Sequence, residues 1–134
     1  YSWKNNEPFP AFIDEIAHIA KACEELRFGF IYHNKKPIAA QMWFVNNKTA
    51  YIFKLAHRPE VEKLSVGSIL TAAMFEYVIE NDKVTKIDFL TGNDNYKKDW
   101  MSKSRPLYTL TAYNTHSLAG GLGAIKSFLD KDQD

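Results

Sequence analysis

The amino-acid sequence predicts an α+β protein whose mixed, mostly antiparallel sheet is flanked by helices on both faces. Three apolar runs between residues 27 and 57 follow one another across short Asn/Lys turns, which is typical of an antiparallel meander. The order strand, helix, strand over residues 49–91 then requires one parallel pair. We therefore expect a sheet of at least five strands, with residues 49–57 parallel to and beside residues 86–92.

The first helix is predicted over residues 11–26. Apolar residues recur there at steps of three and four and form one stripe, while charged residues occupy the opposite side. A cysteine on such a stripe is more often a packing residue than a nucleophile, so we expect Cys23 to be buried. The stripe consists of Phe12, Ile16, Ile19, Cys23 and Leu26.

Three strands are predicted next, over residues 27–33, 37–45 and 49–57. The Asn and Lys residues between them favour short turns that join antiparallel neighbours. Both alternating side-chain sets of the middle strand are largely apolar. A sheet that is apolar on both faces needs cover on both, and we expect helices to provide it.

A second helix is predicted within the stretch from Arg58 to Asp82. Ser65 and Gly67 signal its start. Its apolar residues again recur at helical spacing and predict the face that packs on the sheet. They are Val66, Leu70, Ala73, Met74, Tyr77 and Val78.

The remaining chain is predicted to form a strand over residues 86–91, a short helix over residues 96–101 and a last strand over residues 105–114. Residues 115–134 are expected to form a terminal helix and a charged tail. No repeat or linker divides the sequence, so we expect residues 1–134 to be a single domain. Because the chain begins without Met, we also expect it to be a fragment of a longer protein.

The composition excludes several classes of protein. The chain has 134 residues, is 46% hydrophobic and carries a net charge of +1, so it has no electrostatic footprint for DNA binding. No apolar run approaches the roughly 20 residues of a membrane span. The four histidines lack the spacing of metal ligands, and we expect no metal. A single cysteine excludes an intrachain disulfide and fits a cytoplasmic protein.

Residues 63–70 open the second predicted helix shortly after a strand. The first N–H groups of a helix have no intrahelical partner, and the helix macrodipole favours an anion beside them. Gly67 would allow a phosphate to approach the backbone. The alternative is an ordinary N-cap formed by Ser65 or Ser68, and this stretch alone favours that alternative.

Residues 86–100 combine several polar groups at the end of a predicted strand. Asp88 lies among apolar neighbours, and a buried carboxylate needs donors or a cation. Tyr96 and Lys97 follow a polar turn. If the stretch is only a turn and a packed helix, Lys97 lies on a polar helix face. Taken together, however, these groups indicate a ligand site, because strand ends are where open sheets bind ligands.

This stretch also resembles a known family, through the residues Asp88-Phe89, Gly92, Asp94, Tyr96-Lys97 and Trp100. The pattern is similar to that of the GNAT-type acetyltransferase domain in a bacterial group related to the FemAB aminoacyl transferases. The predicted order of elements over residues 11–114 also follows the GNAT fold. In that bacterial group the domain is often the second of two similar halves, which agrees with a chain that starts without Met.

The resemblance implies an acyl donor, acetyl-CoA or another acyl-CoA. In the GNAT fold the donor's pantetheine arm lies between the two parallel strands, here residues 49–57 and 86–92. The pyrophosphate lies at the start of the central helix, which implies four donor-binding residues: Val66, Gly67, Ser68 and Ile69.

The implied reaction is N-acyl transfer from a thioester to an amine of a small molecule or a cell-envelope precursor. Tyr96 or Asp88 would provide a route for the amine proton, and Lys97 would support negative charge on acyl or phosphate oxygens. A near alternative is a FemAB-like transferase whose donor is an aminoacyl-tRNA. Another is a non-catalytic binding domain with the same fold, which the single glycine of residues 63–68 favours.

Overall fold

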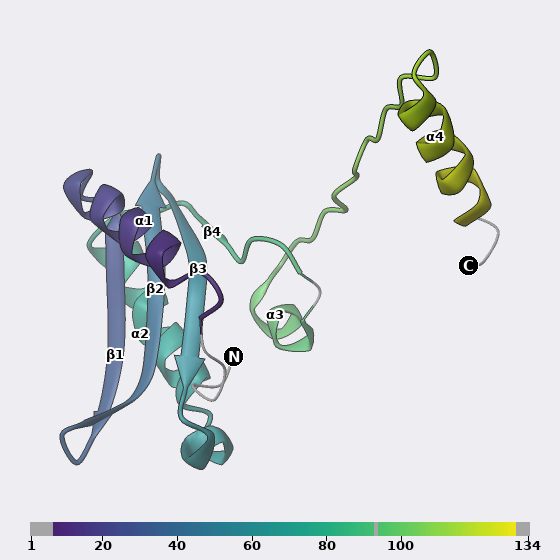
Figure 1. Ribbon diagram of the computed structural model, residues 1–134. Coiled ribbons are helices and arrows are strands. Elements are labelled where there is room, and N and C mark those ends of the chain that lie inside the picture. The colour runs from purple at the N-terminus through teal and green to yellow at the C-terminus, as the bar shows by residue number, and fades with distance from the viewer. Residues whose placement is uncertain (1–6, 93, 131–134) are drawn as a thin grey trace. The chain divides into compact units, whose positions relative to one another are not determined.

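The computed structural model describes residues 7–92 and 94–130, in two compact units, Tyr1–Lys97 and Lys98–Asp134. The elements of the first unit run in the order α1 (Pro10–Ala22), β1 (Leu26–His33), β2 (Lys36–Asn46), β3 (Thr49–His57), the 3₁₀ helix η1 (Pro59–Leu64), α2 (Val66–Glu80) and β4 (Lys86–Asp88) (Figure 1). The short helix α3 (Asn95–Trp100) spans the boundary between the units. The second unit contains α4 (Leu118–Asp130).

The sheet has the order β1-β2-β3-β4. The pairs β1–β2 and β2–β3 are antiparallel, and each is joined by a two-residue turn with positive φ at both positions, Asn34-Lys35 and Asn47-Lys48. Such turns match the twist of the strands they connect. β3 and β4 are parallel, with Thr49–Tyr51 beside Lys86–Asp88. The α+β class, the mostly antiparallel sheet and the parallel pair are therefore confirmed.

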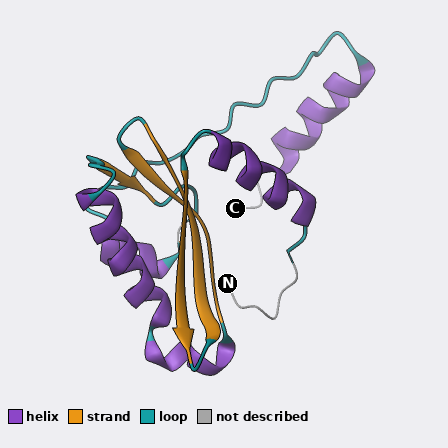
Figure 2. Ribbon diagram, turned by 90° about the vertical axis from the view of Figure 1, so that its left-hand side faces the viewer, coloured by secondary structure: helices purple, strands orange, loops and turns teal. Residues whose placement is uncertain are grey.

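Helices cover both faces of the sheet, because α1 and α2 lie on opposite sides of it (Figure 2). The core under α2 includes Trp43 and Val78, both with 0% of their surface exposed. Gly29 allows this helix to approach β1 closely, since a Cβ built there would lie 2.6 Å from the sulfur of Met74. Met42, which points to the opposite face by alternation, is also buried.

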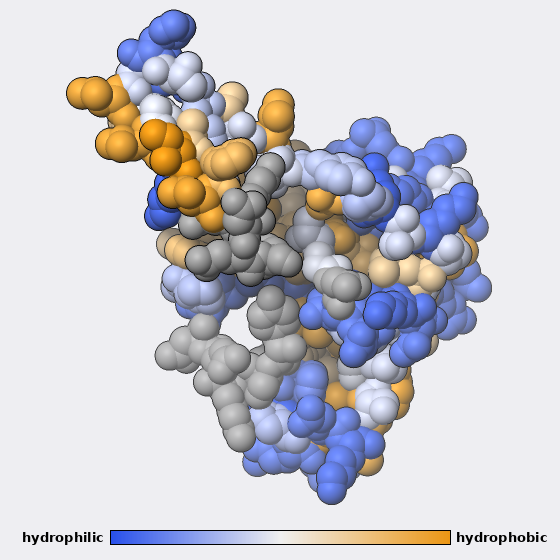
Figure 3. Space-filling view, turned by 90° about the vertical axis from the view of Figure 1, so that its right-hand side faces the viewer, coloured by the Kyte–Doolittle hydropathy of each residue, from blue (hydrophilic) through white to orange (hydrophobic). Residues whose placement is uncertain are grey.

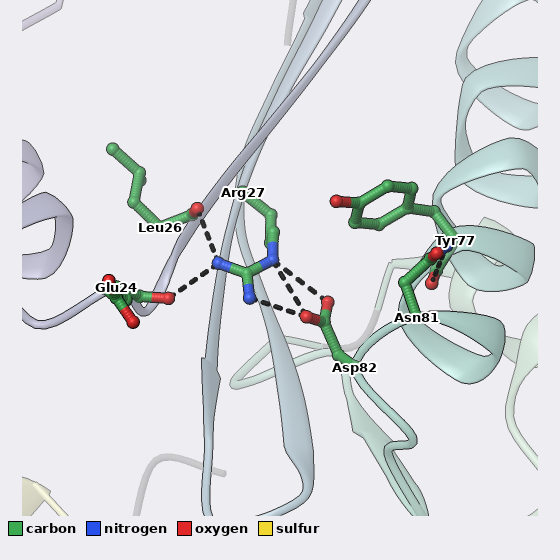
Figure 4. Close-up of polar contacts among 6 residues, drawn as sticks. All are labelled: Glu24, Leu26, Arg27, Tyr77, Asn81 and Asp82. Carbon is green, nitrogen blue, oxygen red and sulfur yellow. Dashed lines mark hydrogen bonds and ion pairs between the residues drawn. The ribbon is translucent and has the colours of Figure 1, made fainter.

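Arg27 fixes the far end of α2 to the sheet (Figure 4). Its Nη2 atom lies 2.6 Å from Oδ1 of Asp82, its Nε atom also donates to that carboxylate, and Nη1 donates to the carbonyls of Glu24 and Leu26. The hydrogen-bonded Asp82 carboxylate raises the pKa of the Arg27 guanidinium above its ordinary value. The two-point contact holds β1 and Asp82, the second residue after α2, in one geometry.

The first predicted helix is longer than the observed one. α1 ends at Ala22, and Glu24 adopts a positive φ of 60°, so Leu26 already belongs to β1. Cys23 caps the helix through its backbone and its side chain is exposed, so the prediction that it is buried is wrong. Phe12 and Ile19 of the same predicted stripe are exposed as well, whereas Ala20 is buried, so the predicted stripe is not the face of α1 that packs on the sheet.

The predicted last strand, over residues 105–114, is wrong. Within the described residues the sheet has four strands instead of at least five, and residues 105–114 form no strand. Leu110 has 94% of its surface exposed, and Leu107 and Tyr108 are exposed as well. Alternating apolar residues favour a strand only where a neighbouring strand and a packing face are present, and this segment has neither within its unit.

The second unit has a well-defined helix start but many exposed apolar side chains. Ser117 caps α4, because its Oγ accepts a hydrogen bond from the N–H of Gly120 at 3.1 Å. The terminal helix is thus confirmed up to residue 130, and residues 131–134 of the predicted tail lie outside the described part.

Hydrophobic side chains reach the surface on the face drawn in Figure 3. On α4 the exposed ones are Leu118, Leu122, Ile125, Phe128 and Leu129.

The second helix agrees with its prediction at both ends. Of its predicted stripe, Val66, Leu70, Met74 and Val78 are buried, whereas Ala73 and Tyr77 are exposed. Among the described residues, no helix combines the length and apolar character that crossing a membrane requires.

Candidate functional site

The turn that follows β4 begins at Asp88, as the sequence suggested. The Oδ1 atom of Asp88 accepts a hydrogen bond from the N–H of Leu90 at 2.9 Å, and its Oδ2 atom lies 2.9 Å from the Nζ atom of Lys86. Leu90 adopts a positive φ of 56°. Asp88 is half-buried, not buried, and its carboxylate has both a donor and a cation as partners. The local bond to Leu90 accounts for the end of β4 at Asp88.

Lys97 lies inside this turn, with only 5% of its surface exposed. Its Nζ atom donates to the carbonyl oxygens of Phe89 at 3.1 Å and Thr91 at 2.5 Å, and it forms an ion pair with Asp94 at 3.4 Å. If the stretch were only a turn and a packed helix, Lys97 would lie on a polar helix face, and its burial contradicts that alternative for this residue. The ammonium is buried because the turn directs two carbonyl groups inward, and a buried charge requires such partners.

Gly92 is the residue that makes room for the ammonium. Its φ is +106°, a backbone conformation that residues other than glycine rarely adopt. A Cβ built there would lie 3.2 Å from both Nζ of Lys97 and Oδ2 of Asp94. The spacing of Gly92, Asp94 and Lys97 in the sequence thus has a structural explanation, a turn closed around one lysine.

Tyr96 connects the turn to the core through a series of tilted and edge-to-face aromatic contacts. Its ring lies 6.3 Å from that of Phe89, which lies 6.1 Å from Phe75 of α2, which in turn lies 5.8 Å from Trp43 of β2. Tyr96 is 40% exposed, while Phe89 is buried. The phenol is thus held by packing on one side and reaches the surface on the other.

The start of α2 differs from the ordinary N-cap considered above. Ser65 is the N-cap residue, but it adopts a left-handed conformation (φ 50°, ψ 33°) and makes no side-chain cap. The first backbone bond joins the N–H of Ile69 to the carbonyl of Ser65 at 3.1 Å. The N–H groups of Val66, Gly67 and Ser68 precede that bond and therefore lack an intrahelical acceptor.

Gly67 faces open space. A Cβ built on it would meet no atom within 4 Å, so packing within the described residues does not require glycine there. The first turn of α2 also contains no acidic residue. The helix start can therefore accept an anion, both by charge and by space.

The two parallel strands part after three residue pairs. Their ladder ends at Tyr51 and Asp88, where β4 also ends, while β3 continues to His57. The left-handed residue Leu90 then directs the chain into the turn. The ladder therefore covers only the first part of the predicted pairing of residues 49–57 with residues 86–92.

The predicted site residues fall into two groups. In one group, Asp88 ends β4, and Tyr96 and Lys97 lie in α3, where the carbonyls of the intervening turn bind Lys97. In the other, residues 66–69 form the first turn of α2. The aromatic contacts described above reach α2 at Phe75, which lies beyond residues 66–69 in the same helix. Sequence reasoning missed Gln41, a buried amide on β2 that bonds to α2. A single polar residue in a strand that is apolar on both faces was the signal that could have identified it.

The part of the chain that the structure describes contains no cluster of potential metal ligands. No group of three or more His, Cys, Asp or Glu residues is arranged there to hold an ion. The site has to be understood from backbone N–H groups, one phenol and a lysine held by carbonyls.

Comparison with known proteins identifies the family. The acetyltransferase (GNAT) domain family matches residues 2–98, which span both candidate groups of residues. Comparisons with curated proteins and with solved structures returned no match. The match covers well over half of the chain and agrees with the mixed sheet and its parallel pair. The chain therefore belongs to the acetyltransferase (GNAT) domain family.

Proposed function

We propose that this chain transfers an acyl group from an acyl-CoA, acetyl-CoA in the simplest case, to the amine of a small molecule or a cell-envelope precursor. The observation that carries the proposal is the start of α2. Three N–H groups precede the first intrahelical bond there, Gly67 faces open space, and the first turn of α2 contains no acidic residue. These properties suit the pyrophosphate of a CoA thioester, bound by the N–H groups of Val66, Gly67 and Ser68. Ile69, the fourth predicted donor-binding residue, already donates its N–H to Ser65.

The short ladder between β3 and β4 suggests where the rest of the donor binds. Beyond Tyr51, β3 continues without β4 beside it. The edge of a strand offers backbone N–H and C=O groups in a row, and a chain that carries amides can pair with them. The pantetheine arm has two such amides. We place it along β3 between Ile52 and His57, with its thioester toward the turn after β4.

The chemistry of the transfer requires few protein groups. The amine nitrogen attacks the thioester carbonyl, the carbon–sulfur bond breaks, the amine loses a proton and the thiolate gains one. Tyr96 is the group we propose for this proton transfer, because its ring is held by Phe89 while part of its surface remains exposed.

Asp88 and Lys97 have a different role in this proposal. Both bind backbone groups of the turn, Asp88 through the N–H of Leu90 and Lys97 through two carbonyls. We propose that they position Tyr96 instead of taking the proton or binding the acyl oxygen directly. This modifies the roles that the sequence suggested, in which either Asp88 or Tyr96 moved the proton.

Calorimetry with acetyl-CoA tests the donor site. In Gly67→Asp the new carboxylate enters open space, so we expect the protein to remain folded and its affinity for acetyl-CoA to fall by a hundredfold or more, on the order of 3 kcal/mol. Ala72→Asp is the matched control, because it adds the same charge at an exposed position further along α2. It should bind within about twofold of the wild type. Binding by the wild type should also weaken as salt is added.

Unchanged affinity in folded Gly67→Asp would move the donor site away from α2. No affinity for acetyl-CoA in the wild type would instead favour a non-catalytic binding domain. That second candidate has one observation in its favour: two of the three suggested catalytic side chains, Asp88 and Lys97, already bind the turn itself. Turnover with an aminoacyl-tRNA and none with acyl-CoA would favour the FemAB-like alternative.

A further inference from the structure

A buried hydrogen-bond network joins the middle strand to the first turns of α2. Gln41 of β2 is 2% exposed, and its Nε2 atom donates to the carbonyl of Gly67 at 3.1 Å and to Oγ1 of Thr71 at 2.8 Å. The Oγ1 atom of Thr71 donates to the same Gly67 carbonyl at 2.9 Å. The Nε1 atom of Trp43 donates to Oε1 of Gln41 at 2.9 Å.

The network uses its polar groups fully. Gln41 donates both amide hydrogens and accepts one bond, while Thr71 accepts one bond and donates its single hydrogen. The indole N–H of Trp43 can only donate, so it requires the oxygen of Gln41 on its side and fixes which way the amide points. No buried side-chain nitrogen or oxygen lacks a partner within the described residues. The side chains of the network therefore have one defined arrangement.

Hydrogen bonds constrain α2 in a way that apolar contacts do not. Leu70, Met74 and Val78 bury the face of α2, but such contacts have no direction and tolerate small shifts along the helix axis. Gln41 fixes the N-terminal end through the carbonyl of Gly67, and Arg27 fixes the other end through Asp82. An apolar side chain in place of Gln41 would fill the space without this constraint.

We infer that Gln41, Trp43 and Thr71 form a positioning site for the acyl donor. They hold the first turn of α2, and with it the N–H groups of residues 66–68, at a fixed place relative to β2 and β3. The inference rests on the proposed function, because it assigns those N–H groups to the donor's pyrophosphate. None of the three side chains is proposed to touch the donor. Their loss should therefore weaken donor binding more than it slows the chemical step.

Thr71→Val and Thr71→Ser form the matched pair for the test, since valine keeps the shape and serine keeps the hydroxyl. We expect acetyl-CoA affinity to fall, and KM for acetyl-CoA to rise, about tenfold in Thr71→Val and about twofold or less in Thr71→Ser. Valine removes both hydrogen bonds of the Thr71 hydroxyl, and one buried hydrogen bond is already worth up to about a factor of ten. The kcat should stay within about threefold in both variants. Gln41→Met, which removes all three bonds of the amide, should weaken binding further.

Amide hydrogen exchange provides a measurement that needs no donor. The N–H groups of Leu70 and Thr71 should exchange faster in Thr71→Val than in Thr71→Ser, while those near Val78 stay unchanged. Equal exchange and equal affinity in the two variants would overturn the inference. If the wild type binds no acetyl-CoA, the proposed function and the donor part of this inference both fail. Exchange then decides whether the network fixes the helix start.

Discussion

The turn after β4 and the first turn of α2 each follow a strand of the parallel pair, and they use their polar groups in opposite ways. In the turn, a carboxylate and an ammonium bind the backbone around them, so the charged groups of Asp88 and Lys97 have partners before any ligand arrives. In α2, the N–H groups of residues 66–68 lack intrahelical partners and Gly67 faces open space. A sequence motif rich in charged residues can thus be a structural device, while a stretch without charge has the properties of an anion site.

We expect the largest effect when the ammonium group is removed from the turn, which tests directly whether Lys97 stabilises it. Lys97→Met keeps the length of the side chain but leaves the carbonyls of Phe89 and Thr91 without a donor, so we expect the free energy of unfolding to fall by about 3 kcal/mol. Chemical denaturation measures the loss. Lys98→Met, at an exposed neighbouring position, should cost about 0.5 kcal/mol or less. Similar small effects of both substitutions would show that Lys97 does not hold the turn.

A pair of glycine substitutions sharpens the comparison further. Gly92→Ala forces a Cβ onto a residue with φ +106°, against Lys97 and Asp94, and should lower the free energy of unfolding by roughly 2 kcal/mol. Gly67→Ala should raise it by roughly 0.5 kcal/mol, because alanine favours a helix and meets no atom there. Thermal unfolding should show stability changes of opposite sign in the two variants. Calorimetric titration should show weaker acetyl-CoA binding in Gly67→Ala. Stability changes of the same sign would contradict this account.

The smallest expected effect concerns Asp88. Asp88→Asn keeps an oxygen for the N–H of Leu90 and loses the ion pair with Lys86, a partly exposed lysine, so we expect a stability loss of about 0.5 kcal/mol. Asp88→Ala also loses the bond to Leu90 and should cost about 1 kcal/mol more. Activity should follow stability in both variants. A fall in kcat on the order of a hundredfold in folded Asp88→Asn would instead identify Asp88 as the general base.

Much of the fold could be predicted because its signals are local. The turns at Asn34-Lys35 and Asn47-Lys48 set the meander, and the helical stretch between Thr49–His57 and Lys86–Asp88 required the parallel pair. Residues 105–114 carry an equally clear alternation and form no strand, because strand formation depends on a partner that a local pattern does not specify.

The candidate site was predictable in position but not in detail. The resemblance selected the turn after β4 and the start of α2 as candidates, and both elements are present. The burial of Lys97, however, depends on two inward carbonyls, which follow from the backbone angles at Leu90 and Gly92. Gln41 was missed for a similar reason. A polar residue in an apolar strand signals a buried partner, but the partner, Thr71, lies thirty positions away along the chain.

The three-residue ladder between β3 and β4 also bears on the order in which the chain folds. The first three strands pair with sequence neighbours across two-residue turns, so the meander can form early with little loss of chain entropy. β4 pairs only after residues 58–85 have crossed the sheet, and three residue pairs then hold it. We expect this strand to dock last and to open first in the native state. The turn that carries Tyr96 would then be the last part of the proposed site to assemble.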